Sequence, residues 1–250
     1  MNILVKSISV IGFALVSLLS STFVKAETVH LTSLSWPPYS DRGLDQQGAS
    51  VAVAQAAFQA MGHELIVDFF PWSRAVAFAS EPGGKYAGYF PEYYYETNDF
   101  VFSESMGTGP LGLVENVNNP ITWRSVDDLE QYTLGVVQDY VNTEELDAKI
   151  ASGDINAQAV VADDRNVLKV AAGRIDAAVI DANVLSYLLE NEPSLRSAVG
   201  QVQMNANLLV DKKLFIAFRN DADGNRWRNI FNEGLEKIDV DAIMQEYLNQ

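Results

Sequence analysis

The sequence contains no cysteine, and it contains only two histidines, His30 and His63. The absence of cysteine excludes disulfide bonds, thiolate metal ligands, cysteine nucleophiles and a thioether-linked lipid anchor. The two histidines lie far apart in the sequence and form no zinc-binding pattern, so we expect both to be structural. These absences predict a protein without a metal ion, a cofactor or a lipid anchor.

Basic residues are also few. The chain has 17 lysines and arginines against 33 aspartates and glutamates, which gives a formal net charge of -16. A surface of this charge repels phosphate backbones and anionic lipid headgroups, so we expect neither nucleic-acid binding nor electrostatic docking to membranes. Hydrophobic residues make up 48% of the chain and charged residues 20%, a composition typical of folded globular proteins.

The first 26 residues have the three-part layout of a secretory signal. Lys6 lies in a short polar region, an apolar run follows over residues 8–19, and Val24-Lys25-Ala26 gives the small-residue pattern of a cleavage site. The apolar run is about 12 residues long, whereas a membrane-spanning helix needs about 20. We predict cleavage after about Ala26, which leaves 15 basic against 33 acidic residues, a net charge of -18, in a secreted chain.

The rest of the chain alternates between strand-like and helix-like segments, which is the pattern of an α/β protein. Residues 48–61 carry apolar side chains at helical spacing and end at Gly62, and a β-rich run over 64–70 follows. Further predicted strands cover residues 30–35, 88–91, 132–138, 157–161, 175–180 and 213–219. Further predicted helices cover residues 71–79, 143–151, 182–190, 221–237 and 239–248, together with one that ends at Gly173 and that Asp163 or Asp164 would cap.

Two motifs with a known chemistry fail in their context. Residues 107–112 have the G-x-G-x-x-G spacing of a dinucleotide-binding loop, but strand-like residues follow, and no helix opens to hold a pyrophosphate. Residues 221–225 resemble the start of a calcium loop, but Arg226 and Asn232 stand where that loop needs glycine and glutamate. We expect Asp221 to cap a helix instead.

Aromatic side chains gather directly after three predicted strands. They occur in Trp36-Pro37-Pro38-Tyr39, in Pro71-Trp72-Ser73-Arg74 and in the run from Tyr89 to Tyr95. Ligands of open α/β sheets bind outside the carboxyl ends of the strands, where these clusters would form a concave aromatic wall for a small molecule. The alternative is that the rings only pack in the core.

Five segments resemble, in the same order, the solute-binding proteins of polar-amino-acid ABC importers, known as extracellular solute-binding protein family 3. They are LTSLSWPPYSD from Leu31, PWSRAV from Pro71, FVFSES from Phe100, SVDDLEQYTLGVVQ from Ser125 and AAGRIDAAVID from Ala171. The resemblance runs over nearly all of residues 29–248. Its most specific piece is GRIDAAVID, where the family ends a helix at glycine and runs a strand into the ligand cleft.

The resemblance implies the α/β, two-lobed periplasmic-binding-protein fold of type II, with two open mixed sheets flanked by helices and joined by two hinge crossings. Lobe one would comprise residues 27–108 and 214–250, and lobe two residues 109–213. The crossings would lie near residues 107–110 and 208–213. In such a fold the lobes close on a ligand by a hinge motion.

The resemblance also assigns roles to single positions. Asp181 stands where amino-acid-binding members pair an aspartate with the ligand ammonium, and it can also cap the following helix. Glu96 stands where those members have the arginine that binds the ligand carboxylate. Asp139, Tyr140 and Val141 stand where those members offer a glycine and threonines. The anion-binding half of an amino-acid site is therefore not found at its expected positions.

Two interpretations of the ligand remain open. Either Arg74, at the start of its helix, receives a ligand carboxylate, or the ligand is a cation without a carboxylate. A salt bridge to Glu92 or Glu96 is a further possible role for Arg74. A cation would pair with Glu96, Asp139 and Asp181 and would gain cation–π contacts with the aromatic rings. The candidate ligand-binding residues are Trp36, Tyr39, Trp72, Arg74, Tyr89, Glu96, Tyr140 and Asp181.

The sequence and the resemblance together predict a periplasmic, monomeric solute-binding protein. It would capture a small polar organic molecule, amino-acid-like or a cationic amine, and deliver it to an inner-membrane ABC permease without catalysing a reaction. One alternative is an enzyme on the same scaffold, since a few relatives of the family are cyclohexadienyl dehydratases, with Glu96 or Asp181 as the general acid. The other alternative is a ligand sensor that acts on a membrane signalling receptor.

Overall fold

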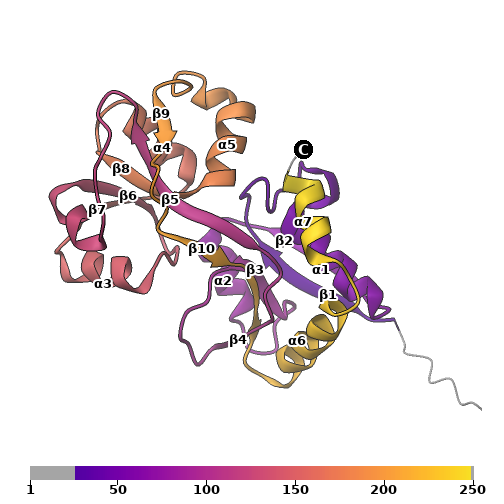
Figure 1. Ribbon diagram of the computed structural model, residues 1–250. Coiled ribbons are helices and arrows are strands. Elements are labelled where there is room, and N and C mark those ends of the chain that lie inside the picture. The colour runs from indigo at the N-terminus through magenta and orange to yellow at the C-terminus, as the bar shows by residue number, and fades with distance from the viewer. Residues whose placement is uncertain (1–25, 249–250) are drawn as a thin grey trace, which may run out of the picture.

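The computed structural model describes residues 26–248, which form two lobes around two separate β-sheets (Figure 1). The predicted signal segment, apart from Ala26, lies outside the described residues. Within the described part of the chain, no helix is both long and apolar enough to span a bilayer.

A five-stranded mixed sheet forms the first lobe, with the strand order β2-β1-β3-β11-β4. Its strands are β1 (Thr28–Ser33), β2 (Glu64–Phe69), β3 (Gly88–Glu92), β4 (Phe100–Phe102) and β11 (Phe215–Arg219). The first three run parallel, whereas β11 is antiparallel to β3 and β4. The helices of this lobe are α1 (Ala49–Ala60), α2 (Trp72–Ala79), α6 (Ala222–Leu235) and α7 (Val240–Leu248). α1 packs against α6 and α7, while α2 packs against β1 and β3.

A second mixed sheet forms the other lobe, with the order β10-β5-β8-β6-β7 and with β9 paired to β5. Its strands are β5 (Thr108–Asn116), β6 (Thr133–Val137), β7 (Asn156–Val160), β8 (Ala177–Asp181), β9 (Val202–Met204) and β10 (Val210–Lys213). Its helices are α3 (Glu144–Ser152), α4 (Asp163–Ala171) and α5 (Ala182–Asn191). β6 is parallel to β7 and β8, so the loops after these strands emerge at one edge of the sheet, as the α/β pattern predicts.

The chain crosses between the lobes twice, and the two crossing segments lie side by side (Figure 1). It leaves the first sheet after β4 to enter β5, and it returns from β10 into β11. β5 and β10 pair in antiparallel register, with Thr108 opposite Lys213. Backbone hydrogen bonds join Met106 N to Leu214 O at 2.9 Å and Leu214 N to Gly107 O at 2.8 Å. The two crossings therefore form one hydrogen-bonded ribbon.

The start of α1 fixes the aromatic loop that follows β1. Gly48, the residue before α1, has a φ of 101°, and a Cβ there would lie 2.8 Å from the Pro38 carbonyl oxygen. This close approach lets Ala49 N donate to Pro38 O at 3.0 Å and Ser50 N donate to Tyr39 O at 2.8 Å. The loop carbonyls thus satisfy N–H groups that a helix start leaves without intrahelical partners. A glycine is needed because no other residue tolerates both the positive φ and the contact.

Local predictions made from single residues had mixed outcomes. Residues 107–112 run into the extended strand β5 and open no helix, as predicted. Asp221 caps α6 by accepting a backbone N–H, also as predicted. The prediction that Asp163 or Asp164 caps α4 is wrong, because Ala162 is the N-cap residue and Asp163 is already helical. As a result, the Asp163 side chain points into the space between the lobes.

Candidate functional site

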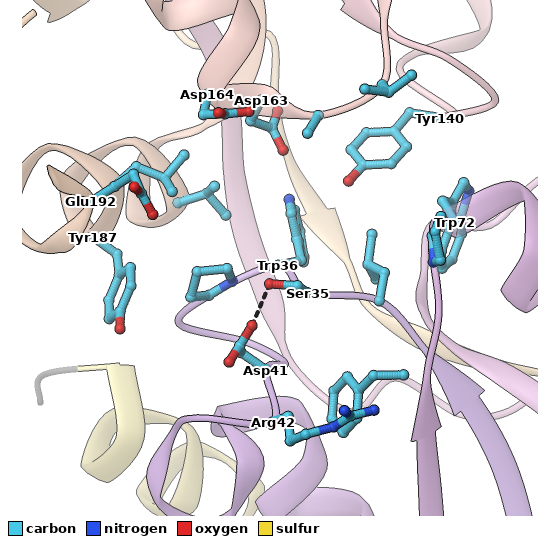
Figure 2. Close-up of a pocket in the computed structure, with 18 of the residues that line it drawn as sticks. Ser35, Trp36, Asp41, Arg42, Trp72, Tyr140, Asp163, Asp164, Tyr187 and Glu192 are labelled. Carbon is cyan, nitrogen blue, oxygen red and sulfur yellow. Dashed lines mark hydrogen bonds between the residues drawn. The ribbon is translucent and has the colours of Figure 1, made fainter. Parts of the chain in front are cut away.

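A cleft between the two lobes holds an outer cavity of about 920 Å³ (Figure 2). One wall comes from the segments after β1 and β2 in lobe one, and the other comes from the start of α4 and from α5 in lobe two. Its volume lies in the range of ligand pockets in other proteins. Its aromatic and polar lining includes Ser35, Trp36, Asp41, Arg42, Phe69, Phe70, Trp72, Tyr140, Asp163, Asp164, Tyr187, Asn191 and Glu192.

Trp36 stands at the centre of the cleft. Its ring stacks on Tyr39 with centroids 4.6 Å apart and meets Tyr93 edge-on at 6.2 Å. Figure 2 shows its indole nitrogen directed at the carboxylate of Asp163 on the opposite lobe, and this indole group acts to lower the pKa of Asp163. Trp36 and Tyr140 also line two smaller cavities, a second one of about 30 Å³ and a third one of about 10 Å³. These two rings therefore separate the outer cavity from the smaller ones.

Three carboxylates are buried around these cavities, on Glu92, Asp163 and Asp181. Burial raises the pKa of Asp163 to about 7, and the negative charges of Asp181 and Asp164 act in the same direction. Burial also raises the pKa of Asp181 to about 7 and the pKa of Glu92 to about 8. A buried carboxylate without a cationic partner is costly in its charged form. A cation bound in the cleft would supply that partner.

Asp181 and Tyr39 join the two lobes on the side of the crossing strands. The Oδ1 atom of Asp181 accepts the backbone N–H groups of Asn183 at 2.8 Å and Val184 at 3.2 Å, so Asp181 caps α5 as predicted. The Tyr39 hydroxyl donates to Oδ2 of Asp181 at 3.2 Å and accepts from the Asn183 amide at 2.8 Å. Asp181 therefore uses its oxygens on protein groups and borders only the third cavity. The predicted contact between Asp181 and a ligand ammonium stays a prediction.

Trp72 and Ser73 join the lobes at a second place. The indole N–H of Trp72 donates to the carbonyl oxygen of Asp139 at 3.1 Å, and the Ser73 hydroxyl donates to the Asp139 carboxylate. Asp139 has a φ of 63°, a conformation uncommon for residues other than glycine, asparagine and aspartate. Trp72 also meets Tyr140 edge-on with centroids 6.0 Å apart, which places rings of both lobes against each other.

Four of the predicted ligand-binding residues, Tyr39, Arg74, Tyr89 and Glu96, line none of the three cavities. Arg74 and Glu96 are exposed, and the ion pairs of residues 26–248 join Arg74 to neither Glu92 nor Glu96. Tyr89 is fully buried behind Trp72, and its hydroxyl lies 2.8 Å from that of Tyr95. The cleft thus gives no support to Arg74 as a carboxylate receptor or to Glu96 as a partner of a cation.

Apart from Asp181, the acidic residues that line the three cavities were not predicted as ligand-binding residues. Asp163 and Asp164 follow β7, and Glu92 is the last residue of β3. The rule that ligands gather at the carboxyl ends of strands applies to both places. Applied to every strand, and not only to those followed by aromatic clusters, this rule would have predicted Asp163. Glu192 and Asp41 line the outer cavity from a helix end and a loop, and no local sequence signal marks them.

The cleft offers little to an anionic ligand. Arg42 is the one basic residue among those that line the outer cavity in the described chain, against the acidic residues Asp41, Asp163, Asp164 and Glu192. α4 and α5 both begin at the cleft, and helix N-termini attract anions. In this protein Asp181 already accepts the first N–H groups of α5, and Asp163 and Asp164 place two carboxyl groups in the first turn of α4. Among residues 26–248 no cluster of three metal-ligating side chains occurs.

No protein-family model matches this sequence, and no curated protein matches it significantly. Solved structures do match. A histidine kinase sensor domain with similarity to periplasmic binding proteins superposes with a TM-score of 0.74 at 17% identity, covering 88% of this chain and 95% of that chain. An amino acid ABC transporter substrate-binding protein from Streptococcus pneumoniae, bound to L-arginine, gives a TM-score of 0.70 at 16% identity, with 90% and 95% covered.

A third match is an ancestral amino-acid-binding protein described as a precursor of cyclohexadienyl dehydratase. It gives a TM-score of 0.66 at 17% identity and covers 89% of this chain and 93% of that chain. At these identities the likeness shows the fold alone. The chain therefore has the two-lobed, periplasmic-binding-protein-like fold that its sequence predicts, with two mixed sheets flanked by helices.

Proposed function

We propose that this protein is a periplasmic solute-binding protein that closes its two lobes on a small organic cation. The observation that carries the proposal is the cleft lining, where Asp163 lies buried against Trp36 and Tyr140 and three further acidic residues face a single arginine. Carboxylates attract a cation directly, and aromatic faces add cation–π attraction. The protein would work by closure and would catalyse no reaction.

A cation without a carboxylate fits this cleft better than an ordinary amino acid. The solved neighbours include proteins bound to L-arginine and to L-glutamate, ligands that carry an α-carboxylate. In this cleft a carboxylate would meet Arg42 alone, because Arg74 is exposed and lines none of the cavities. The ammonium group of an amino acid would find carboxylate partners, whereas its carboxylate group would be repelled by the acidic residues of the cleft.

A thermal-shift screen of the secreted chain, residues 27–250, tests the proposal. The screen would include primary to quaternary amines, the standard amino acids and small dicarboxylic acids. A ligand present at a hundredfold excess over its Kd stabilises the folded state by about 2.7 kcal/mol, so the best amine should raise Tm by about 5–10 °C. A dicarboxylic acid or a neutral amino acid as the best ligand would contradict the proposal.

Two matched variants sharpen this screen. Asp163→Asn removes a cleft charge with little change of shape, and Asp154→Asn removes an exposed charge outside the cleft. We expect the first variant to weaken amine binding at least tenfold and the second to leave it unchanged, because only the first removes a carboxylate that faces the ligand. The absence of catalysis is tested by incubation with prephenate or arogenate, which should give no aromatic product.

Delivery to an inner-membrane ABC permease is part of the proposal, and sensing is the second candidate. The likeness to a histidine kinase sensor domain favours sensing, while the likeness to ABC transporter substrate-binding proteins favours transport. Crosslinking in membranes of the native host, followed by mass spectrometry of the captured partner, separates the two. A permease is expected, and a signalling receptor in its place would favour the sensor.

A further inference from the structure

The second cavity, of about 30 Å³, has an unusual lining. Four aromatic rings and one carboxyl group surround it, together with four apolar residues. The rings belong to Trp36, Trp72, Tyr93 and Tyr140, and the carboxyl group belongs to Glu92. We name this arrangement the aromatic cage. Three of its rings come from lobe one and Tyr140 comes from lobe two, so the cage is complete only where the lobes meet.

The four rings form two edge-on pairs. Trp36 meets Tyr93 at 6.2 Å with an interplanar angle of 81°, and Trp72 meets Tyr140 at 6.0 Å with an angle of 80°. Rings set nearly perpendicular to each other present both faces and edges to the space that they enclose. A cation within about 6 Å of the ring faces is attracted by the negative π-surfaces, and this attraction grows when water is excluded.

Glu92 lines the cage and has no cationic partner within salt-bridge distance among residues 26–248. It is 6% exposed, and its Oε1 atom accepts the backbone N–H of Tyr93 at 2.7 Å. The ammonium group of Lys212 lies over the Tyr93 ring, 5.0 Å from its centroid. Lys212 does not line the cage, whereas Asp163 and Asp181 place two further carboxyl groups beside it. A cation bound in the cage would favour the charged forms of these carboxyl groups and would pair with them.

Tyr93 supplies a separate indication of a ligand. Its side chain is 7% exposed and lines both smaller cavities, and its hydroxyl has no hydrogen-bond partner among the described residues. Buried hydroxyl groups in proteins nearly always have such a partner. A polar group next to the ligand's ammonium would supply one.

We infer that the aromatic cage is a recognition site for an alkyl-substituted ammonium group, with Glu92 as its counter-ion. The cavity of about 30 Å³ has room for about one water molecule, so the two lobes that share the cage have to part to admit such a group. This inference rests on the proposed function and narrows its ligand class. A bare ammonium group is strongly hydrated and would lose that hydration against aromatic and apolar walls. Methyl or other alkyl groups on the nitrogen spread the charge, lower the cost of desolvation and contact the rings directly. Caged aromatic rings recognise quaternary and methylated ammonium groups for this reason.

Three related probes test the inference by isothermal titration calorimetry on the secreted chain. Choline carries a trimethylammonium group, ethanolamine carries the unmethylated ammonium group, and 3,3-dimethylbutan-1-ol is the neutral analogue of choline with the same shape. We expect choline to bind at least about tenfold more tightly than ethanolamine and the neutral analogue to show no binding. These differences would reflect both methyl–ring contact and charge.

Variants test whether the residues of the cage cause the tight binding of choline. Glu92→Gln and Tyr140→Leu should each weaken choline binding at least tenfold, whereas Tyr140→Phe, which keeps the ring, should weaken it less than threefold. Tyr94→Leu replaces an exposed neighbouring tyrosine outside the cage and is the matched control. Unchanged Tm values and circular dichroism spectra would show that each variant is folded.

The possible outcomes distinguish failure of the cage from failure of the cation-binding function on which it rests. Ethanolamine binding as tightly as choline, or choline binding unaffected by Tyr140→Leu, would overturn the cage while leaving a cation-binding function in place. Binding of the neutral analogue with the affinity of choline would overturn the role of Glu92 and of charge. Failure of choline and of every amine in the thermal-shift screen would overturn both proposals.

Discussion

At the scale of single residues, burial raises the pKa values of the buried carboxyl groups of the cleft. Without a ligand, these groups therefore keep their protons to a higher pH in the folded state than in the unfolded state. Burial raises the pKa of Asp163 from 3.8 to about 7, which corresponds to about 4 kcal/mol if the whole rise is expressed. Between these two values the folded state binds a proton that the unfolded state has released. The stabilisation is therefore complete below about pH 4 and is lost as the pH rises through 7.

This pH dependence of the stability leads to a first prediction. Without added ligand, the free energy of unfolding should fall between pH 5 and pH 8, and Asp163→Asn should make the fall smaller by about 1–3 kcal/mol. Urea denaturation at both pH values measures it. Asp154→Asn controls for the change in net charge. Equal slopes for Asp163→Asn and for the unmodified protein would contradict the raised pKa of Asp163.

Asp181 gives a second prediction at this scale, because it caps α5 and also bonds to Tyr39. Asp181→Ala removes the acceptor of two backbone N–H groups and should lower the free energy of unfolding by about 1–2 kcal/mol. Asp181→Asn keeps an acceptor for α5 and removes a buried charge. At pH 8 it should therefore be at least as stable as the unmodified protein. A loss of stability in the asparagine variant equal to that of the alanine variant would mean that the charge itself is required.

At the scale of elements, β5 has to pass very close to the contact between the lobes. A Cβ at Gly109 would overlap the Asp181 carboxylate and would lie 2.6 Å from the Tyr39 hydroxyl. Gly112, in the same strand, is surrounded instead by the flexible ends of Leu208 and Met204. Gly109 and Gly112 therefore allow close packing around a strand, although the spacing of the glycines in residues 107–112 resembles that of a nucleotide-binding loop.

This difference predicts that Gly109→Ala and Gly112→Ala have unequal effects. Gly109→Ala should push the two lobes apart and lower the free energy of unfolding by about 1–3 kcal/mol, as overpacking does in protein cores. Gly112→Ala should cost less, because side chains move more easily than a hydrogen-bonded contact. Thermal and urea denaturation of both variants measures the difference, and a larger cost at Gly112 would be contrary to this packing.

At the scale of the whole molecule, the lobes touch through direct hydrogen bonds on two sides of the cleft. Tyr39 bonds to Asp181 and Asn183 near the crossing strands, and Ser73 and Trp72 bond to Asp139 further out. Each hydrogen bond of this kind contributes about 0.5–1.5 kcal/mol. The balance between open and closed states therefore depends on protein contacts as well as on the ligand.

A double variant, Tyr39→Phe with Ser73→Ala, should shift this balance toward the open state. Without ligand, small-angle scattering should give a larger radius of gyration than for the unmodified protein. Saturating ligand should restore the compact form with an affinity about 5- to 100-fold weaker, because binding then drives closure without these bonds. Ser80→Ala, which removes a hydroxyl that bonds to Val76 O within α2, is the control and should change neither quantity.

The sequence by itself determined the α/β class and the order of the helices α1 to α7, whereas the short strands β4, β9 and β10 were not predicted. Helical and strand periodicity depend on local side chains, so α1, β2 and α5 lie within a few residues of their predicted bounds. The aromatic loop after β1 was placed correctly at the cleft, because a strand end fixes the start of the following loop. The capping role of Asp181 followed from its position at the start of a helix.

Only the tertiary structure decided which charges face the ligand. Arg74 and Glu96 carry the expected chemistry, yet the rotation of α2 and the path of the chain after β3 leave both exposed. Glu92 and Asp163 both lie near strand ends, but they come from different lobes, and only the packing of the lobes buries them in one cleft. Helix rotation and lobe contact depend on packing between segments far apart in the chain. The net charge of -16 indicated an acidic protein, and the fold placed part of that acidity inside an aromatic cleft.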